Sequence, residues 1–273
     1  MKKCGKILLF SLAALLLACT PKSTAEEEKN NNTVEQPQDA ASGTITISDT
    51  IHIDSYDPES PALSMNLTFE PIRLDNNAAT EKAIEAISYA LSATESKNLE
   101  DACNAFARRM VAEYEEWRPD YIDIKSNSGE AFWLNHYCTA TGTCIKGYRG
   151  YVNYLVNYDE YKGGAHPSNY TLAMTFDPTD GHEVTLDEIM KEGYEEALLP
   201  IIIEELMEFF GVSSKEKLGE MLFDMENRLF VTKNVILDKD YIIFIYNHYE
   251  IAPYAAGTII LDVEYSKLKG ILK

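Results

Sequence analysis

Two short segments combine turn-forming residues with aromatic side chains, and they are the best candidates for chemistry in this chain. They cover residues 161–167 and 249–257. In the first segment, Gly163 and Gly164 permit positive backbone angles, and Pro167 favours an extended conformation at His166, so a sharp bend would display the imidazole. An imidazole in that position can contact a ligand or, as a weaker alternative, serve an enzyme that acts on cell-wall glycans.

The second segment adds two tyrosines between turn formers, and a tyrosine ring offers an apolar face with a polar hydroxyl. Together the two segments predict a ligand-binding surface. Its candidate contacts are Gly163, Gly164, His166, Tyr249, Glu250, Pro253, Tyr254 and Gly257. The alternative interpretation is that both segments are loops at a sheet edge that pack on each other, with the tyrosines filling space.

Motifs of metal binding and catalysis are missing from the sequence. The five histidines include no pair with metal-ligand spacing, and there is no glycine-rich phosphate loop, Gly-x-Ser-x-Gly elbow or paired cysteine motif. We therefore predict no metal, no cofactor and no catalytic residue. An enzyme that acts on cell-wall glycans stays open as a weaker alternative, because 44 acidic residues will place some carboxylate pair at a catalytic distance by chance.

The start of the chain has the pattern of a secretion signal. Three lysines precede an apolar stretch, 7–17, that is too short to cross about 30 Å of hydrocarbon. These lysines are Lys2, Lys3 and Lys6. The pattern predicts that the protein is exported from the cytoplasm.

The apolar stretch ends in Leu-Leu-Ala-Cys at positions 16–19, which resembles a bacterial lipobox. The resemblance implies removal of the signal peptide 1–18 and attachment of acyl chains such as palmitate to Cys19. Two or more chains anchor a protein stably. We expect a lipid-anchored protein of the cell envelope, on the outer membrane and facing the periplasm or the surface if the cell is Gram-negative. An ordinary signal peptide with a chance cysteine is the alternative.

The next segment, 19–42, is rich in polar and acidic residues and predicts a disordered tether, because it cannot bury enough apolar surface to fold. The whole chain is also acidic, with a formal charge of −20 from 44 acidic and 24 basic residues. Such a surface repels nucleic acid and attracts cationic partners. The prediction is a membrane-attached protein that binds a cationic protein or peptidoglycan, and no nucleic acid.

Three cysteines remain beyond the predicted signal peptide and lipid site. Cys138 and Cys144 flank a short segment between two strand-like runs, so we expect a disulfide across a hairpin in an oxidising compartment. Cys103 falls on the apolar side of a predicted helix, where a buried and inert thiol is expected.

Alternation of apolar and polar residues predicts half-buried strands in the first two thirds of the chain. These strands cover 44–53, 63–69, 131–137, 148–158 and 170–176. The third and fourth are expected to form a hairpin that turns near Gly142. Later strands are predicted at 235–237, 241–246 and 258–263, and the middle run is apolar throughout, as in a central strand.

Apolar residues three and four positions apart predict helices between the strands. They lie around 84–91, 99–117, 198–209 and 265–272. Asn98 is expected to cap the second helix, and Pro119 to end it. The grouping of elements predicts the α+β class: antiparallel sheets with helices packed on one face, divided into two similar-sized subdomains, 43–160 and 161–273.

Three stretches resemble the extracytoplasmic domain of the anti-sigma factor RsiV: 163–166, 176–189 and, most specifically, 249–257. Residues 43–158 resemble, more loosely, the deacetylase-associated domain found in RsiV and in PdaC-type peptidoglycan deacetylases. In RsiV-like proteins the module binds lysozyme, and in the deacetylases it accompanies a separate catalytic domain. The sequence shows no transmembrane helix, sigma-binding segment or deacetylase domain, so the resemblance implies binding without signalling.

These observations lead to one main functional hypothesis, a lipid-anchored envelope protein that captures lysozyme or a related cationic wall hydrolase without catalysis. The alternative is a peptidoglycan or glycan binder whose tyrosines and Trp133 stack on sugars.

Overall fold

The computed structural model describes residues 43–273. The predicted signal peptide, the lipid site Cys19 and the predicted tether therefore lie outside the described residues. None of the helices in the described range is long and apolar enough to span a bilayer.

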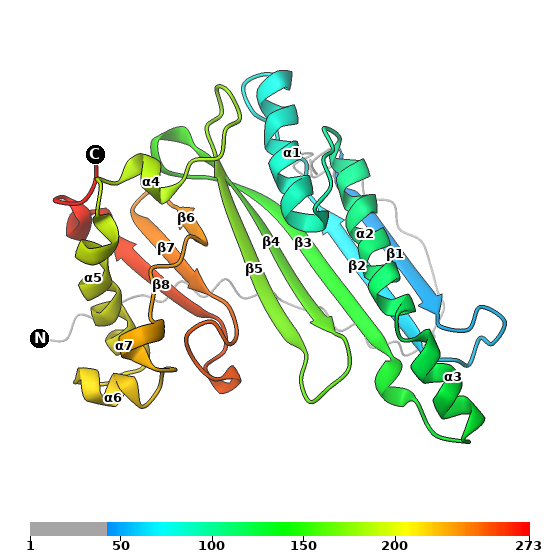
Figure 1. The fold of residues 1–273 in the computed structure, drawn as a ribbon. Coiled ribbons are helices and arrows are strands. Elements are labelled where there is room, and N and C mark those ends of the chain that lie inside the picture. Colours follow the sequence, from blue (N-terminus) through cyan, green and yellow to red (C-terminus); the bar gives the residue numbers. More distant parts are fainter. Residues whose placement is uncertain (1–42) are drawn as a thin grey trace, which may run out of the picture. The chain divides into compact units, whose positions relative to one another are not determined.

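The predicted α+β class is confirmed, with one five-stranded and one three-stranded sheet (Figure 1). The larger sheet has the order β1-β2-β3-β4-β5. Its strands are β1 (Ile45–His52), β2 (Ala62–Phe69), β3 (His136–Lys146), β4 (Val152–Tyr161) and β5 (Ser168–Phe176). All neighbours pair antiparallel except β2 and β3, which are parallel. A parallel pair needs a long crossover, and three helices supply it here.

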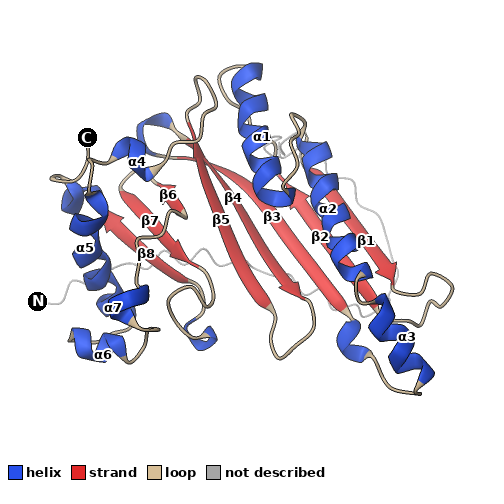
Figure 2. Cartoon of the chain, in the orientation of Figure 1, coloured by secondary structure: helices blue, strands red, loops and turns tan. Residues whose placement is uncertain are grey.

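These helices are α1 (Asn77–Ser92), α2 (Leu99–Glu115) and α3 (Arg118–Ser126). α1 and α2 lie across one face of the large sheet (Figure 2). The Asn98 cap is confirmed, since its side chain accepts a hydrogen bond from the Asp101 amide over 3.1 Å. Pro119, expected to end α2, instead lies in the first turn of α3, where a missing amide hydrogen is tolerated.

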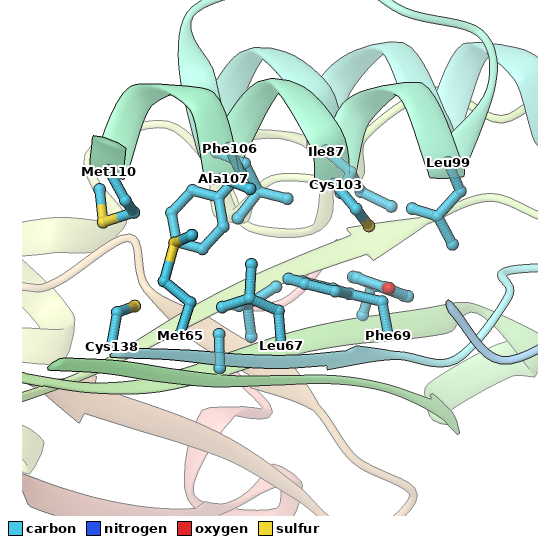
Figure 3. Packing of buried hydrophobic residues seen from close by; sticks show 14 of the residues in the cluster. Met65, Leu67, Phe69, Ile87, Leu99, Cys103, Phe106, Ala107, Met110 and Cys138 are labelled. Atoms are coloured by element: carbon cyan, nitrogen blue, oxygen red, sulfur yellow. The ribbon is translucent and has the colours of Figure 1, made fainter. Parts of the chain in front are cut away.

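The first core forms between α2 and β2. Figure 3 shows Cys103 and Phe106 of α2 pointing toward Leu67 and Phe69 of β2. All four side chains are at most 1% exposed. A fully buried phenylalanine or leucine contributes about 1.5–3 kcal/mol, so this contact fixes the helix on the sheet.

The second core belongs to the three-stranded sheet, whose order is β6-β7-β8. Its strands are β6 (Val235–Leu237), β7 (Tyr241–Tyr246) and β8 (Ile259–Glu264), and its helices are α4 (Leu186–Ile189), α5 (Tyr194–Phe209), α6 (Lys215–Gly219) and α7 (Met225–Arg228). The apolar run 241–246 is the central strand, as predicted. On α5, Leu198, Ile202 and Leu206 are buried, whereas Phe209, expected beside them, is 43% exposed. The predicted last helix is only a 3₁₀ turn, Tyr265–Leu268.

The predicted hairpin is present, because β3 and β4 pair antiparallel, but its turn does not lie near Gly142. β3 continues straight through this residue. A side chain at Gly142 would place its Cβ 2.5 Å from the Phe69 ring and 2.6 Å from the Tyr154 hydroxyl. The glycine is therefore required for close packing within the sheet rather than for a turn. The turn into β4 comes later, at residues 147–151.

The predicted disulfide is also wrong, because no turn separates its two cysteines. Cys138 and Cys144 lie on one strand, six residues apart, which separates them by roughly 20 Å. A disulfide bridges Cα atoms at most about 7 Å apart. Both residues and Cys103 are free thiols, and burial raises the pKa of each to about 12.

Asparagine side chains join the two sheets. Buried Asn153 of β4 donates to the Leu237 carbonyl over 3.1 Å and accepts from the Leu237 amide over 3.0 Å. Asn234 and Asn247 bond the free edge of β5, at the backbone of Thr171 and Ala173. The large sheet includes β5 and therefore continues past residue 160. The division into subdomains 43–160 and 161–273 stays a prediction.

Candidate functional site

The two segments that the sequence singled out meet in the structure. The first is the hairpin loop between β4 and β5, and the second joins β7 to β8. The His166 ring stacks on the Tyr254 ring, with centroids 4.6 Å apart and planes 12° from parallel. The Tyr254 hydroxyl donates to the Pro167 carbonyl over 2.9 Å. The loops thus pack on each other, as the alternative interpretation expected, while His166 stays exposed.

Two more aromatic side chains complete this exposed aromatic cluster, defined as His166, His248, Tyr249 and Tyr254. His248 stacks on Tyr254 at 4.7 Å, and its Nδ1 is 3.0 Å from the Asn169 carbonyl. Tyr249 lies 5.7 Å from Tyr254, is 54% exposed and has a left-handed backbone with φ +66°. His248 was not among the predicted contacts, although its place beside Tyr249 was a signal for it.

The other predicted residues shape the loops. Gly163 (φ +84°) packs near Trp133, and the Gly164 carbonyl accepts from the Tyr161 hydroxyl over 3.0 Å. Gly257 closes the short 3₁₀ turn Tyr254–Ala256 that follows exposed Pro253. These residues therefore position the rings.

Glu250 has a different place from the rest of the predicted set. Its carboxylate accepts from the Asn247 amide over 2.9 Å, and it lines a groove away from the stacked rings. The structure thus brings His166, Tyr249 and Tyr254 together and assigns Glu250 to a turn.

A groove of about 320 Å³ adjoins the exposed aromatic cluster. It lies along polar residues of β3, β4 and β5, and Thr258 and Ile260 bound its other side. Asn169 connects groove and cluster, because it lines the groove and holds His248. Asp159 lines the groove too and lies 3.4 Å from the Tyr137 hydroxyl, whose pKa is raised by burial and then by this carboxylate. The site therefore consists of stacked rings and a neighbouring groove that contains a carboxylate.

A second groove, of about 530 Å³, lies between α1 and the edge of β5. Tyr158 and Tyr170 stack within it at 5.3 Å, and Tyr89, 65% exposed, stands at its side. Glu183, Lys233 and Glu250 contribute charges to its lining. Flat rings beside polar groups are suited to the faces and hydroxyls of sugars.

Four titratable groups outside the site, His182 and the three cysteines, take structural roles. Hydrogen bonds to Asp180 (2.6 Å) and Glu188 (3.0 Å) raise the pKa of His182 and tie together the turn after β5. Burial keeps the three thiols protonated at neutral pH, which makes them poor nucleophiles. Nowhere in residues 43–273 do three metal-binding side chains gather. What the site offers chemically is a contact surface.

One known family matches a range in the C-terminal half of the chain. Residues 187–266 match a family described as "Protein of unknown function (DUF3298)", a range that includes the three-stranded sheet, Tyr249 and Tyr254. No curated protein matches the chain.

Two solved structures resemble the whole described fold. One, a DUF3298 family member from Bacteroides fragilis, has a TM-score of 0.72 and 26% identity, covering 84% of this chain and 92% of that chain. The other, a DUF3298 family protein from Pseudomonas aeruginosa, has a TM-score of 0.55 and 17% identity, covering 84% and 94%, and shows the shared fold alone. Three residues of the exposed aromatic cluster, His248, Tyr249 and Tyr254, thus lie in the range 187–266 that matches the DUF3298 family.

Proposed function

We propose that this chain is a lipid-anchored cell-envelope protein that captures lysozyme or a related cationic wall hydrolase without catalysing a reaction. The observation that carries the proposal is the exposed aromatic cluster, which Asn169 links to a groove lined in part by Asp159. The formal charge of −20 adds long-range attraction for a cationic partner.

The groove is suited to one side chain of a partner. Its volume of about 320 Å³ is too small for a protein segment with bulky side chains but accommodates a single lysine or arginine. Such a cation would lie near the Asp159 carboxylate, while the rings of His166 and Tyr249 contact the surrounding surface. Aromatic anchors at the centre of an interface often carry much of the binding energy.

The anchor is part of the same proposal. Cleavage before Cys19 and acylation of its sulfur would hold the folded part near the membrane, with 20–42 as the spacer. Metabolic labelling with palmitate tests this. A Cys19→Ser variant should lose both the label and sedimentation with membranes, and retention of both would contradict the lipid anchor.

The capture proposal is tested by titrating the fragment 43–273, which contains both hydrophobic cores, with lysozyme at low and physiological salt. An unrelated protein of similar basic charge is the control. Saturable one-to-one binding of lysozyme that survives physiological salt is expected, because stacking contacts are screened less than charge attraction. Equal binding of both proteins, or of neither, would contradict capture.

Two alanine variants locate the contact. His166→Ala and Tyr249→Ala should each weaken lysozyme binding about tenfold or more, since truncation of an aromatic anchor often costs more than 1 kcal/mol. Tyr56→Ala is the matched control, because Tyr56 is 96% exposed on the loop between β1 and β2. If the control weakens binding as much as the two site variants, the contact lies elsewhere.

The second groove favours a second candidate function, binding of peptidoglycan glycans. Its stacked pair, Tyr158 and Tyr170, is the specific observation. Trp133, expected to stack on sugars, is half-buried against Trp117 instead. Soluble glycan fragments should bind with little salt dependence. Tyr89 lines this groove but not the smaller one, so Tyr89→Ala should weaken glycan binding while lysozyme binding persists. Failure of the fragments to bind would remove this candidate.

A further inference from the structure

A second group of aromatic residues lies next to Gly163 in the hairpin loop between β4 and β5. This enclosed aromatic cluster is defined as Tyr114, Trp117, Trp133 and His136. Trp117 meets Trp133 edge to face at 5.4 Å, and His136 lies 5.1 Å from Tyr114 and 5.9 Å from Trp117. Its members come from α2, from the residues just after α2, and from the start of β3 with the turn before it.

Three members of the cluster line a cavity of about 220 Å³ beside α2. Its apolar lining includes Leu63, Met110 and Cys138. Trp117 adds an aromatic wall, and Tyr114 and His136 add polar atoms. The cavity is therefore mostly apolar with a small number of polar groups, which is the usual composition of a small-molecule site.

The two polar residues are buried without partners. Tyr114 is 2% exposed and His136 is 4% exposed. Neither the Tyr114 hydroxyl nor the His136 Nε2 has a hydrogen-bond partner within the described part of the chain. Buried polar atoms are almost always satisfied, so two of them lining one cavity indicate that something binds there.

Three charged residues also line the cavity, namely Glu113, Glu116 and Lys162. The Lys162 ammonium lies 2.8 Å from a Glu113 oxygen and 3.0 Å from a Glu160 oxygen. Burial also lowers the pKa of His136 to about 4, so its imidazole is neutral at physiological pH. Lys162 is therefore not free for an anionic ligand, and Glu116 belongs to the exposed rim of the cavity. A hydroxyl, which both donates and accepts, complements Tyr114 and either tautomer of His136.

We propose that this cavity binds a small neutral molecule that has an apolar body about the size of one aromatic ring and a single hydroxyl group. The size follows from the volume, since an apolar cavity of about 150 Å³ holds benzene. The hydroxyl satisfies the Tyr114 hydroxyl or the His136 Nε2, and the ring contacts Trp117 and Met110. The proposal is independent of lysozyme capture, because the exposed aromatic cluster contributes no residue to this cavity.

The probes are phenol and toluene. They are similar in size, and only phenol has a hydroxyl group. The chain has only two tryptophans, Trp117 and Trp133, so tryptophan fluorescence reports directly on this cluster. Phenol should change the fluorescence saturably and bind several-fold tighter than toluene. In crystals grown with phenol, its oxygen should lie within hydrogen-bond distance of Tyr114 or His136.

The matched variants are Tyr114→Phe and Tyr194→Phe. Tyr194 is also buried, at 5% exposed, but belongs to the second core. Tyr114→Phe should weaken phenol binding roughly two- to tenfold, the value of one net hydrogen bond, and leave toluene binding unchanged. Tyr194→Phe should change neither.

Three results would overturn the proposal. They are a lack of saturable phenol binding, equal binding of phenol and toluene to the unmodified protein, and a crystal structure with only ordered water on Tyr114 and His136. The first two measurements and the crystal structure use the unmodified protein, so they decide the matter even if Tyr114→Phe fails to fold.

Discussion

The two aromatic clusters have similar residue types and opposite environments. The enclosed cluster contains a buried histidine, and its rings meet edge to face, with planes 64–85° apart. In the exposed cluster, two histidines and a tyrosine surround Tyr254, with planes 12–34° apart. The enclosed rings pack against α2 and hold two unpartnered polar atoms, whereas the exposed rings have polar partners on neighbouring loops.

The hairpin loop between β4 and β5 contacts both clusters. Gly163 packs against Trp133 and His136, and His166, three residues later, stacks on Tyr254. Three rings of the enclosed cluster line a cavity, whereas the cluster around His166 includes two exposed rings, His166 and Tyr249.

The largest expected effect separates the clusters by stability. Trp117→Ala should lower the free energy of unfolding by about 3 kcal/mol, because it removes a large ring from the enclosed cluster. Tyr249→Ala, in the exposed cluster, should lower it by less than about 0.5 kcal/mol. Urea denaturation measures both values. Equal losses of free energy would show that the two clusters do not differ in their contribution to stability.

The next effect is a pH dependence of stability that arises in the enclosed cluster. Because the folded-state pKa of His136 is about 4, below the unfolded value of 6.5, the unfolded chain binds a proton first as the pH falls. His136 should therefore cost the fold about 2 kcal/mol of stability between pH 7 and pH 5.

His136→Gln should flatten this part of the stability profile, as measured by urea denaturation at several pH values. His182 is the contrasting case. Its partners Asp180 and Glu188 raise its pKa, so it contributes stability below pH 6.5 that is lost as the pH rises through its folded-state pKa. If His136→Gln leaves the slope between pH 7 and pH 5 unchanged, His136 is not the group responsible.

Much of the fold followed from local patterns in the sequence. The α2 stripe and the apolar strand β7 were predictable, because a helix or central strand imposes its period on the residues that it buries. Gly142 misled the prediction, since a glycine between two strand-like runs is typical of a turn. The glycine is needed because Phe69 and Tyr154 lie too close for a side chain. Both residues belong to other strands, so the sequence around Gly142 does not indicate the contact.

The candidate site was predictable only in part for a related reason. Each loop was recognisable by its glycines, prolines and aromatics, but the stacking of His166 on Tyr254 joins residues far apart in the chain. The cavity was not predictable at all. Tyr114 and Trp117 had the spacing of ordinary core residues, and nothing near His136 in the sequence indicated that its Nε2 would lie buried without a partner.

A smaller effect tests whether Gly163 in the hairpin loop contacts the enclosed cluster. Gly163→Ala and Gly164→Ala should each cost about 1–2 kcal/mol, because φ is +84° at the first and +99° at the second. Only Gly163 has Trp133 and His136 within 4 Å of an added Cβ. Gly163→Ala alone should therefore shift tryptophan fluorescence, and an equal shift from Gly164→Ala would contradict the contact.

The smallest expected effect concerns the link between loop and helix. Lys162, in the loop, pairs with Glu113 of α2 and Glu160 of β4, and its side chain is 42% exposed. Since solvent screens such pairs, Lys162→Met should lower the free energy of unfolding by only about 0.5–1 kcal/mol. Arg118→Met, at an exposed pair with Glu115 outside the loop, is the matched control.

The informative readout for Lys162→Met is the effect of salt on tryptophan fluorescence. If the pair holds the loop against α2, raising the salt concentration should move the fluorescence of the unmodified protein toward that of Lys162→Met, because salt weakens partly exposed ion pairs. Arg118→Met should keep the salt response of the unmodified protein. A response that persists in Lys162→Met would mean that the loop is held by its contacts with Trp133 and His136 rather than by charge, and the two clusters would then be joined by packing alone.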